Sequence, residues 1–124
     1  MLKGKNILVT GGAGFIGSHL VDKLIKIGGK VYVIDDLSTG NIENLNKSAV
    51  FWNQDISKVN ISSLIEFMSN IDVVFHLAAL ARVQPSIENP TLYHDKNVTG
   101  TNNLLVAAVK AGVKKFVFSS SSSV

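Results

Sequence analysis

Short apolar runs and longer amphipathic segments alternate along this sequence, and few folds accommodate that order. The apolar runs, rich in Val, Ile and Phe, are Asn6–Thr10, Lys30–Ile34, Val50–Asn53, Val73–His76 and Lys115–Ser119. Such alternation is typical of parallel strands joined by crossover helices. With 124 residues, 46% of them hydrophobic, the chain suffices for one domain with a core and is too short for two.

The segments between the runs predict helices of different lengths. The strongest pattern is an apolar stripe followed by a glycine stop, made by Phe15, Ile16, Leu20, Val21, Leu24, Ile25, Gly28 and Gly29. A shorter helix is predicted at Ile61–Ser69, and one or two turns at Asn41–Leu45. A last helix is predicted from Pro90, whose fixed φ suits a first turn, to a stop at Gly112.

A glycine-rich segment, Thr10–Gly17, lies between the first predicted strand and the first predicted helix. Gly11, Gly14 and Gly17 would permit a tight turn, close approach of the backbone to a pyrophosphate, and close packing of helix on strand. The helix N-terminus would present free N–H groups to the anion. The spacing is not the Gly-x-Gly-x-x-Gly of many dehydrogenases, so the interpretation depends on the strand and helix around it.

Two carboxylates, Asp35 and Asp36, follow the second predicted strand. A carboxylate at that place accepts hydrogen bonds from the adenosine ribose and repels a 2′-phosphate, which favours NAD over NADP. No Arg lies between Asp36 and Gly40 to receive such a phosphate. The alternative, a solvated turn carboxylate, has more weight for Asp36 than for Asp35.

Composition and charge exclude several other functions. The 12 Lys and Arg against 9 Asp and Glu are scattered, with only Lys114 and Lys115 adjacent, so nucleic-acid binding is not indicated. The absence of cysteine excludes thiolate metal sites and a disulfide framework and fits a reducing compartment. The segment Met1–Asn6 lacks the long apolar core of a signal peptide or membrane span. We expect a cytoplasmic protein with no metal and no membrane partner.

The motifs, in their order, resemble those of the extended short-chain dehydrogenase/reductase family, in particular its nucleotide-sugar epimerases and dehydratases. The resemblance covers essentially the whole chain and rests on Thr10–Gly17, Val33–Gly40, Gln54–Ile56, Phe75–Ala79, Asn97–Thr101 and Phe118–Ser121. It implies an α/β fold over residues 1–124: a Rossmann-type, doubly wound parallel sheet of five strands in the order 3-2-1-4-5. NAD would bind at the switch point between the first and fourth strands.

The resemblance also implies which residues bind the cofactor. The adenosine end would be held by Asp36, Leu37, Ser38, Thr39, Gly40, Asp55 and Ile56. The backbone of Phe15 and Ile16 would contact the pyrophosphate, and Leu77, Ala78, Ala79 and Ala81 would run beneath the pyrophosphate and the nicotinamide ribose. Asn97 would support the strand ends and the cofactor side of the pocket, and Ser119 is also expected to bind the cofactor.

A serine run, Ser119–Ser123, continues directly from the fifth apolar run. It could be a flexible tail, but a disordered tail usually leaves from a polar, strand-free context. In the resembled family, a Ser or Thr at this strand end polarises the substrate hydroxyl beside a Tyr-x-x-x-Lys pair. The strand register selects Ser121 for that role, with Ser122 and Ser123 as neighbours that could share it. A hydroxyl can both donate and accept, which suits a relay to an oxygen that is being oxidised. The sequence departs from the family here, since neither Tyr32 nor Tyr93 has a lysine four residues later.

Two functions of different class remain. The first is the NAD-binding domain of a nucleotide-sugar epimerase or dehydratase, and the second is a stand-alone dinucleotide-binding module without turnover. The segment Ala79–Pro90 looks most like epimerases of UDP-hexoses or UDP-N-acetylhexosamines, but it could equally be a polar loop that contacts no ligand. We expect the gene sequence after Val124 to decide, through the presence or absence of Tyr-x-x-x-Lys and a sugar-binding domain. The 124 residues alone are not expected to turn over UDP-sugars.

Two further expectations concern a histidine and an interface. His76, at the end of the fourth predicted strand, could touch phosphate or be a satisfied structural residue. The fifth strand has an open outer edge, and the helix Pro90–Ala111 carries more apolar residues than one core-facing stripe needs. We therefore expect a homo-oligomer, most simply a two-fold dimer.

Overall fold

A five-stranded parallel sheet in the order β3-β2-β1-β4-β5 forms the centre of the protein. The structure is a computed structural model that describes residues 2–80 and 83–120. The strands are β1 (Asn6–Thr10), β2 (Lys30–Asp35), β3 (Val50–Asn53), β4 (Val73–His76) and β5 (Lys115–Phe118). The fold class and the strand order expected from the sequence are confirmed.

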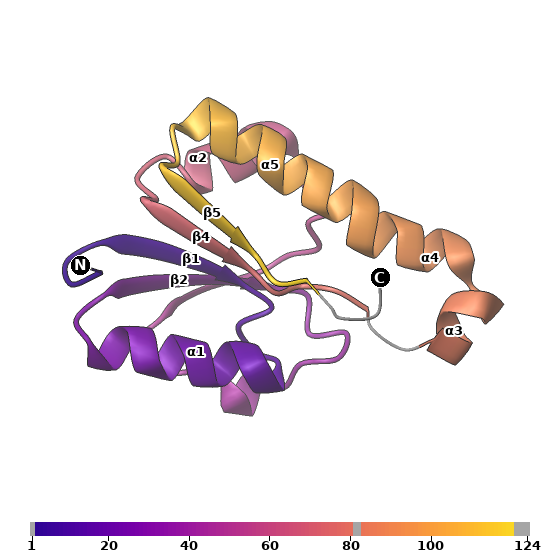
Figure 1. The fold of residues 1–124 in the computed structure, drawn as a ribbon, viewed down its shortest axis with the longest axis horizontal. Coiled ribbons are helices and arrows are strands. Elements are labelled where there is room, and N and C mark those ends of the chain that lie inside the picture. Colours follow the sequence, from indigo (N-terminus) through magenta and orange to yellow (C-terminus); the bar gives the residue numbers. More distant parts are fainter. Residues whose placement is uncertain (1, 81–82, 121–124) are drawn as a thin grey trace.

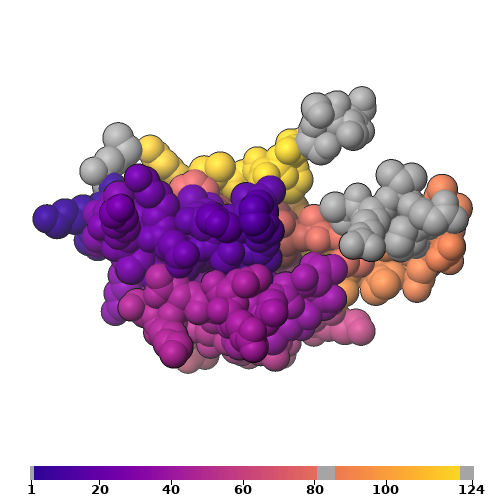
Figure 2. Space-filling model, turned by 90° about the horizontal axis from the view of Figure 1, so that it is seen from below, coloured from indigo at the N-terminus to yellow at the C-terminus, as the bar shows by residue number. Residues whose placement is uncertain are grey.

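Helices cover both faces of the sheet (Figure 1). The helix α1 lies on one face, and α2 and α5 lie on the other. The helices α3 and α4 extend past the carboxyl ends of the strands and project beyond the body of the protein, in orange in Figure 2. The helical elements are α1 (Phe15–Lys26), η1 (Ile42–Asn44), α2 (Ile61–Phe67), α3 (Val83–Glu88), α4 (Pro90–His94), η2 (Asp95–Thr99) and α5 (Gly100–Ala111).

Each face of the sheet has its own core, because successive side chains of a strand point to opposite faces. In β1, Ile7 and Val9 pack with residues of α1. Leu8, between them, packs with Leu64 of α2 and Leu104 of α5. All five side chains have an exposed fraction of 0%. The central strand is thus enclosed on both faces, which holds its carboxyl end in a fixed position.

The segment predicted as one helix, Pro90–Ala111, is helical throughout but changes its winding in the middle. It begins where the Asn89 side chain accepts the N–H of Leu92 at 3.1 Å. It ends at Gly112, which has a left-handed φ of 79°. Between α4 and α5, η2 is a π-helical turn. Such turns widen a helix locally and are frequent at functional sites.

One helix was not predicted from the sequence. α3 occupies part of the segment Ala79–Pro90, which was interpreted as a loop, either near a sugar or polar without a ligand. It ends before Asn89, because a residue that precedes proline disfavours the helical conformation. The remaining differences are small: α2 stops two residues earlier than predicted, at Phe67, and β5 stops at Phe118.

The two-faced core generates a prediction about stability. Replacing the buried Leu104 by alanine should lower the free energy of unfolding by about 2 to 5 kcal/mol, since a cavity remains between α5 and the sheet. Ile42, which is 49% exposed, provides the control, and its replacement by alanine should cost less than about 1 kcal/mol. Urea unfolding followed by the fluorescence of Trp52 measures both. Equal costs would mean that α5 does not pack as described.

Candidate functional site

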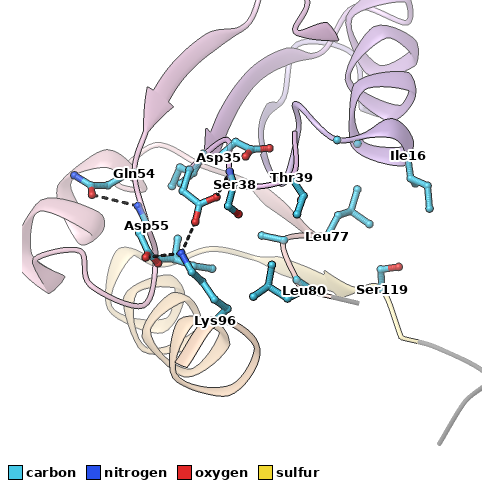
Figure 3. A pocket seen from close by; sticks show the side chains of 18 of the residues that line it. Ile16, Asp35, Ser38, Thr39, Gln54, Asp55, Leu77, Leu80, Lys96 and Ser119 are labelled. Carbon is cyan, nitrogen blue, oxygen red and sulfur yellow. Dashed lines mark hydrogen bonds and ion pairs between the residues drawn. The ribbon is translucent and has the colours of Figure 1, made fainter. Parts of the chain in front are cut away.

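The segments that follow the five strands enclose a pocket of about 380 Å³ (Figure 3). This volume lies in the range of small-molecule sites, and the pocket spans the point where the strand order reverses, between β1 and β4. Its lining is Gly11, Gly14, Phe15, Ile16, Gly17, Ile34, Asp35, Asp36, Ser38, Thr39, Gln54, Asp55, Ile56, Leu77, Ala78, Ala79, Leu80, Lys96 and Ser119.

The glycine-rich loop brings the start of α1 to the pocket. Gly11 has a left-handed φ of 74°, and a Cβ there would lie 2.9 Å from the backbone nitrogen of Ala78. A Cβ on Gly17 would lie 2.0 Å from the carbonyl oxygen of Gly11, so only glycine lets α1 approach the loop this closely. The first turn of α1 has neither a side-chain cap nor an acidic residue. Its first N–H groups, which have no partner within the helix, are therefore suited to an anion.

Asp35 joins this loop to the end of β2. Its carboxylate accepts the N–H of Ala13 at 2.9 Å through Oδ2 and the N–H of Leu37 at 2.8 Å through Oδ1. The residue is 8% exposed and lines the pocket. The side chain predicted to bind ribose therefore also holds the two loops together, and each oxygen keeps a second lone pair for a ligand.

The turn after β2 has two kinds of residue. Ser38 and Thr39 line the pocket, as expected. Leu37 and Gly40, which were also predicted to bind the cofactor, lie outside that lining. Leu37 has a left-handed φ of 62°, and Gly40 is so close to the glycine-rich loop that a Cβ would lie 3.0 Å from the carbonyl carbon of Ala13. These two residues shape the turn.

Lys96, which the sequence did not single out, connects two acidic residues of the pocket. Its ammonium lies 2.5 Å from Oδ2 of Asp36 and 2.6 Å from Oδ2 of Asp55 (Figure 3). Burial alone would raise the pKa values of both carboxyl groups, but hydrogen bonds from Lys96 and from Ser38 or Ser57 lower them below the ordinary value. Burial would likewise lower the pKa of Lys96, and the two carboxylates raise it. All three groups are charged at neutral pH.

His76 is at the centre of a network of hydrogen bonds between Thr10 and Thr101. The hydroxyl of Thr10 accepts the N–H groups of Leu77 and Ala78 at 3.1 and 3.2 Å, so its own proton points to Nδ1 of His76 at 2.6 Å. The hydroxyl of Thr101 donates to the carbonyl oxygen of its own helix at 2.6 Å and therefore accepts from Nε2 of His76 at 2.7 Å. The network assigns a neutral imidazole with its proton on Nε2.

This network decides between the two interpretations of His76. The side chain is 2% exposed, and both of its nitrogens are bound within the protein. Burial lowers its pKa from 6.5 to about 4. His76 is a structural residue that joins the glycine-rich loop to the start of α5, and it has no nitrogen left for a phosphate.

Asn97, in the π-helical turn, fixes the loop after β4. Its Oδ1 accepts the N–H of Leu80 at 2.8 Å, and its Nδ2 donates to the carbonyl oxygen of Leu80 at 2.8 Å. Asn97 does not line the pocket, so it acts on the lining through Leu80. Ser119 lies at the end of β5 and at the edge of the pocket, where it was expected (Figure 3). Ala81 and Ser121 lie outside the described residues.

The part of the chain that the structure describes contains no group of three or more His, Asp or Glu residues placed to hold a metal ion. Among the helices of the same residues, none has the length and apolar character needed to cross a membrane.

Comparison with known proteins assigns the family. A sequence profile of the NAD dependent epimerase/dehydratase family matches residues 7–124. The chain belongs to this family. The resemblance inferred from the motifs is thereby confirmed, and NAD, the expected cofactor, is the cofactor of the family.

Relatives of this epimerase/dehydratase chain include enzymes of known structure. The UDP-glucose 4-epimerase of Lactobacillus helveticus is 45% identical over 115 residues, which are 93% of this chain and 35% of that protein. The UDP-glucose 4-epimerase of Thermotoga maritima, solved with UDP-glucose, is 49% identical with a TM-score of 0.89, over 94% of this chain and 38% of that one. The Thermus thermophilus UDP-glucose 4-epimerase, solved with NAD, is 41% identical with a TM-score of 0.86, over 94% and 37% of the two chains. The chain spans just over a third of the length of these relatives.

Because His76 is buried, we expect the free energy of unfolding to fall at acidic pH. Because the pKa of His76 is lower in the folded chain, the unfolded chain binds more protons between pH 6.5 and about 4, and stability falls as the pH falls through this window. The loss should approach about 3 kcal/mol.

Urea unfolding at several pH values measures this loss. His76→Gln should remove most of the pH dependence in the window, whereas His19→Gln, which replaces an exposed histidine, should keep the wild-type slope. A wild-type stability that does not change between pH 6.5 and 4 would contradict the assigned network.

Proposed function

We propose that this chain binds NAD and is the cofactor-binding part of a UDP-sugar 4-epimerase, with a UDP-hexose or a UDP-N-acetylhexosamine as substrate. The observation that carries the proposal is the pocket itself. It runs from the acidic ends of β2 and β3, across the free N-terminus of α1, to Ser119 after β5. An elongated dinucleotide with its phosphates in the middle matches that order of groups.

Different residues along the pocket would bind different parts of the cofactor. Asp35, Asp36 and Asp55 offer acceptors for the hydroxyl and amino groups of adenosine. The N–H groups at the start of α1 would hold the pyrophosphate. The backbone of Leu77–Ala79 borders the remaining space, toward Ser119, for the nicotinamide ribose.

NAD, when bound, supplies a reversible hydride acceptor, which is the chemistry that inversion of a sugar hydroxyl group requires. Toward that end of the pocket the chain contributes hydroxyl groups. Ser121 remains the residue predicted to polarise the substrate hydroxyl, and Ser119, two residues before it, borders the pocket. A hydroxyl can accept one proton and donate another, which suits a relay to an oxygen that is being oxidised.

The second candidate, a dinucleotide-binding module without turnover, requires only the pocket. The pocket lining described above supports NAD binding whichever candidate holds. NAD binding is therefore common to both candidates, and epimerisation separates them.

We also place the protein in the cytoplasm. The lack of cysteine supports a reducing compartment.

NAD should bind more tightly than NADP, by about tenfold or more. The adenosine end of the pocket presents three carboxylates against one ammonium, and a single unfavourable charge contact of about 1.4 kcal/mol gives that factor. Calorimetric titration of the chain with both cofactors provides the measurement. Absence of NAD binding would refute the proposed function, and equal affinities would remove Asp35 from its role at the ribose.

We further propose that the chain forms a homo-oligomer through the outer face of α5. In this helix Leu104 is buried, but three apolar neighbours remain exposed: Leu105 by 42%, Val106 by 37% and Val109 by 79%. Covering several hundred Å² of apolar surface stabilises an assembly by several kcal/mol before association costs, at ~25 cal/mol per Å². A dimer with closed two-fold symmetry is the commonest homo-oligomer.

Light scattering on a size-exclusion column should give a mass above 13.3 kDa that depends on concentration. Val109→Lys should shift the distribution toward the monomer, because it places a charge in the apolar face. Ile27→Lys, at the exposed end of α1 on the opposite face of the sheet, is the control and should leave the mass unchanged. A constant mass of one chain for the wild type would show that this face stays open to water.

A further inference from the structure

The ammonium of Lys96 lies where the ends of two strands and the π-helical turn meet. Asp36 follows β2, Asp55 follows β3, and Lys96 belongs to η2, so the contact joins residues that are 60 and 41 positions apart. The binding of adenosine proposed above explains the two carboxylates. It does not explain why the ammonium of Lys96, which comes from η2, is placed between the two carboxylates.

Each carboxylate is already oriented by its own loop. Asp36 accepts the N–H of Ser38 through Oδ1 at 2.9 Å, and Asp55 accepts the N–H and the hydroxyl of Ser57 through Oδ1 at 2.9 and 2.6 Å. In both residues the remaining oxygen, Oδ2, meets Lys96. Orientation by the turns therefore aims two like charges at the same place, and their approach depends on the ammonium.

The contact is partly enclosed, which gives it more weight than an ordinary surface ion pair. The side chains of Lys96, Asp36 and Asp55 are 17%, 23% and 18% exposed. Charges shielded from water in this way interact more strongly than exposed ones, which contribute little. A change of charge at Lys96 is therefore felt by a ligand that lies against either carboxylate.

We propose that Lys96 is a specificity-determining residue of the adenosine end of the pocket: it holds Asp36 and Asp55 together as one wall and, through its charge, sets how strongly that wall discriminates against a 2′-phosphate. The inference rests on the proposed binding of NAD and goes beyond it, because it assigns the degree of discrimination to a residue outside the segment after β2. The chemical group that is distinguished is a ribose 2′-phosphate from a free 2′-hydroxyl.

The direction of the effect follows from the charges. Asp35, Asp36, Asp55 and Lys96 together carry two net negative charges, and without Lys96 they carry three. A ribose hydroxyl is neutral and gains or loses little from this change. A 2′-phosphate, which is a dianion, meets additional repulsion. Replacing Lys96 by a neutral residue should therefore increase discrimination, and replacing Asp36 by a neutral residue should decrease it while leaving Lys96 with one carboxylate.

Fragments of the cofactor test this at the adenosine end alone. The full chain is titrated by calorimetry with 5′-AMP and with adenosine 2′,5′-bisphosphate, and the ratio of the two dissociation constants is compared between variants. Lys96→Met should increase the preference for 5′-AMP on the order of fivefold, the factor that corresponds to about 1 kcal/mol for one unit charge pair in water. Asp36→Asn should reduce the preference.

Two further variants separate charge from structure. Lys96→Arg keeps the positive charge and should keep a ratio near that of the wild type. Lys110→Met removes one positive charge from an exposed site in the last turn of α5 and should not change the ratio. The effect of Lys96→Met should also shrink in concentrated salt, because screening weakens a charge effect and leaves a packing effect in place.

The outcomes are distinct. A wild type that binds neither fragment nor NAD would overturn the proposed function and this inference with it. A wild type that binds both fragments, with a ratio that Lys96→Met leaves unchanged, would overturn this inference alone. The same holds if Lys96→Met weakens both fragments equally at every salt concentration, since Lys96 would then serve only the structure of the wall.

Discussion

The route of the chain around β1 determines where the pocket lies. β1 pairs with β2 on one edge and with β4 on the other, and helices cover both of its faces. The loop after β1 leads to α1 on one face of the sheet, whereas the segment after β4 leads through α3 and α4 to α5 on the other (Figure 1). Because these two connections leave the sheet toward opposite faces, a crevice stays open between them at the carboxyl ends of β1 and β4. The pocket is therefore a result of topology, and side chains only give it its chemical character.

Backbone contacts and neutral polar groups hold this crevice in shape. The absence of a Cβ at Gly17 lets α1 touch the loop, and Thr10 ties that loop to the segment after β4 through its hydroxyl group. His76 continues the connection to Thr101 at the start of α5. Among the described residues, no buried side-chain nitrogen or oxygen lacks a partner. A fully satisfied network of this kind rigidifies the site.

The features that follow from local sequence could be predicted, and those that depend on distant contacts could not. The strands, α1 and the glycine-rich loop have periodicity and glycine signals within a few residues of one another. Lys96 has no such signal, because its partners are 41 and 60 positions away and a lone lysine on a helix usually faces water. Asp35 was recognised as a pocket residue, but its bond to Ala13, which is 22 positions away, depends on how two loops meet. The π-helical turn likewise lies within a continuous helical pattern that gives no sign of it.

The same central position of β1 has a consequence for synthesis and folding. Its partner β2 follows within 30 residues, but its pairing with β4 joins Thr10 to His76, which is 66 residues further along the chain. A ribosome that adds roughly 5 to 20 residues per second takes several seconds to make that distance. During this time one edge of a strand with three consecutive apolar residues, Ile7–Val9, has no partner, and non-local parallel pairing is slow to form. The strand on which the finished site depends is thus the one most exposed to misassociation while the chain is being made.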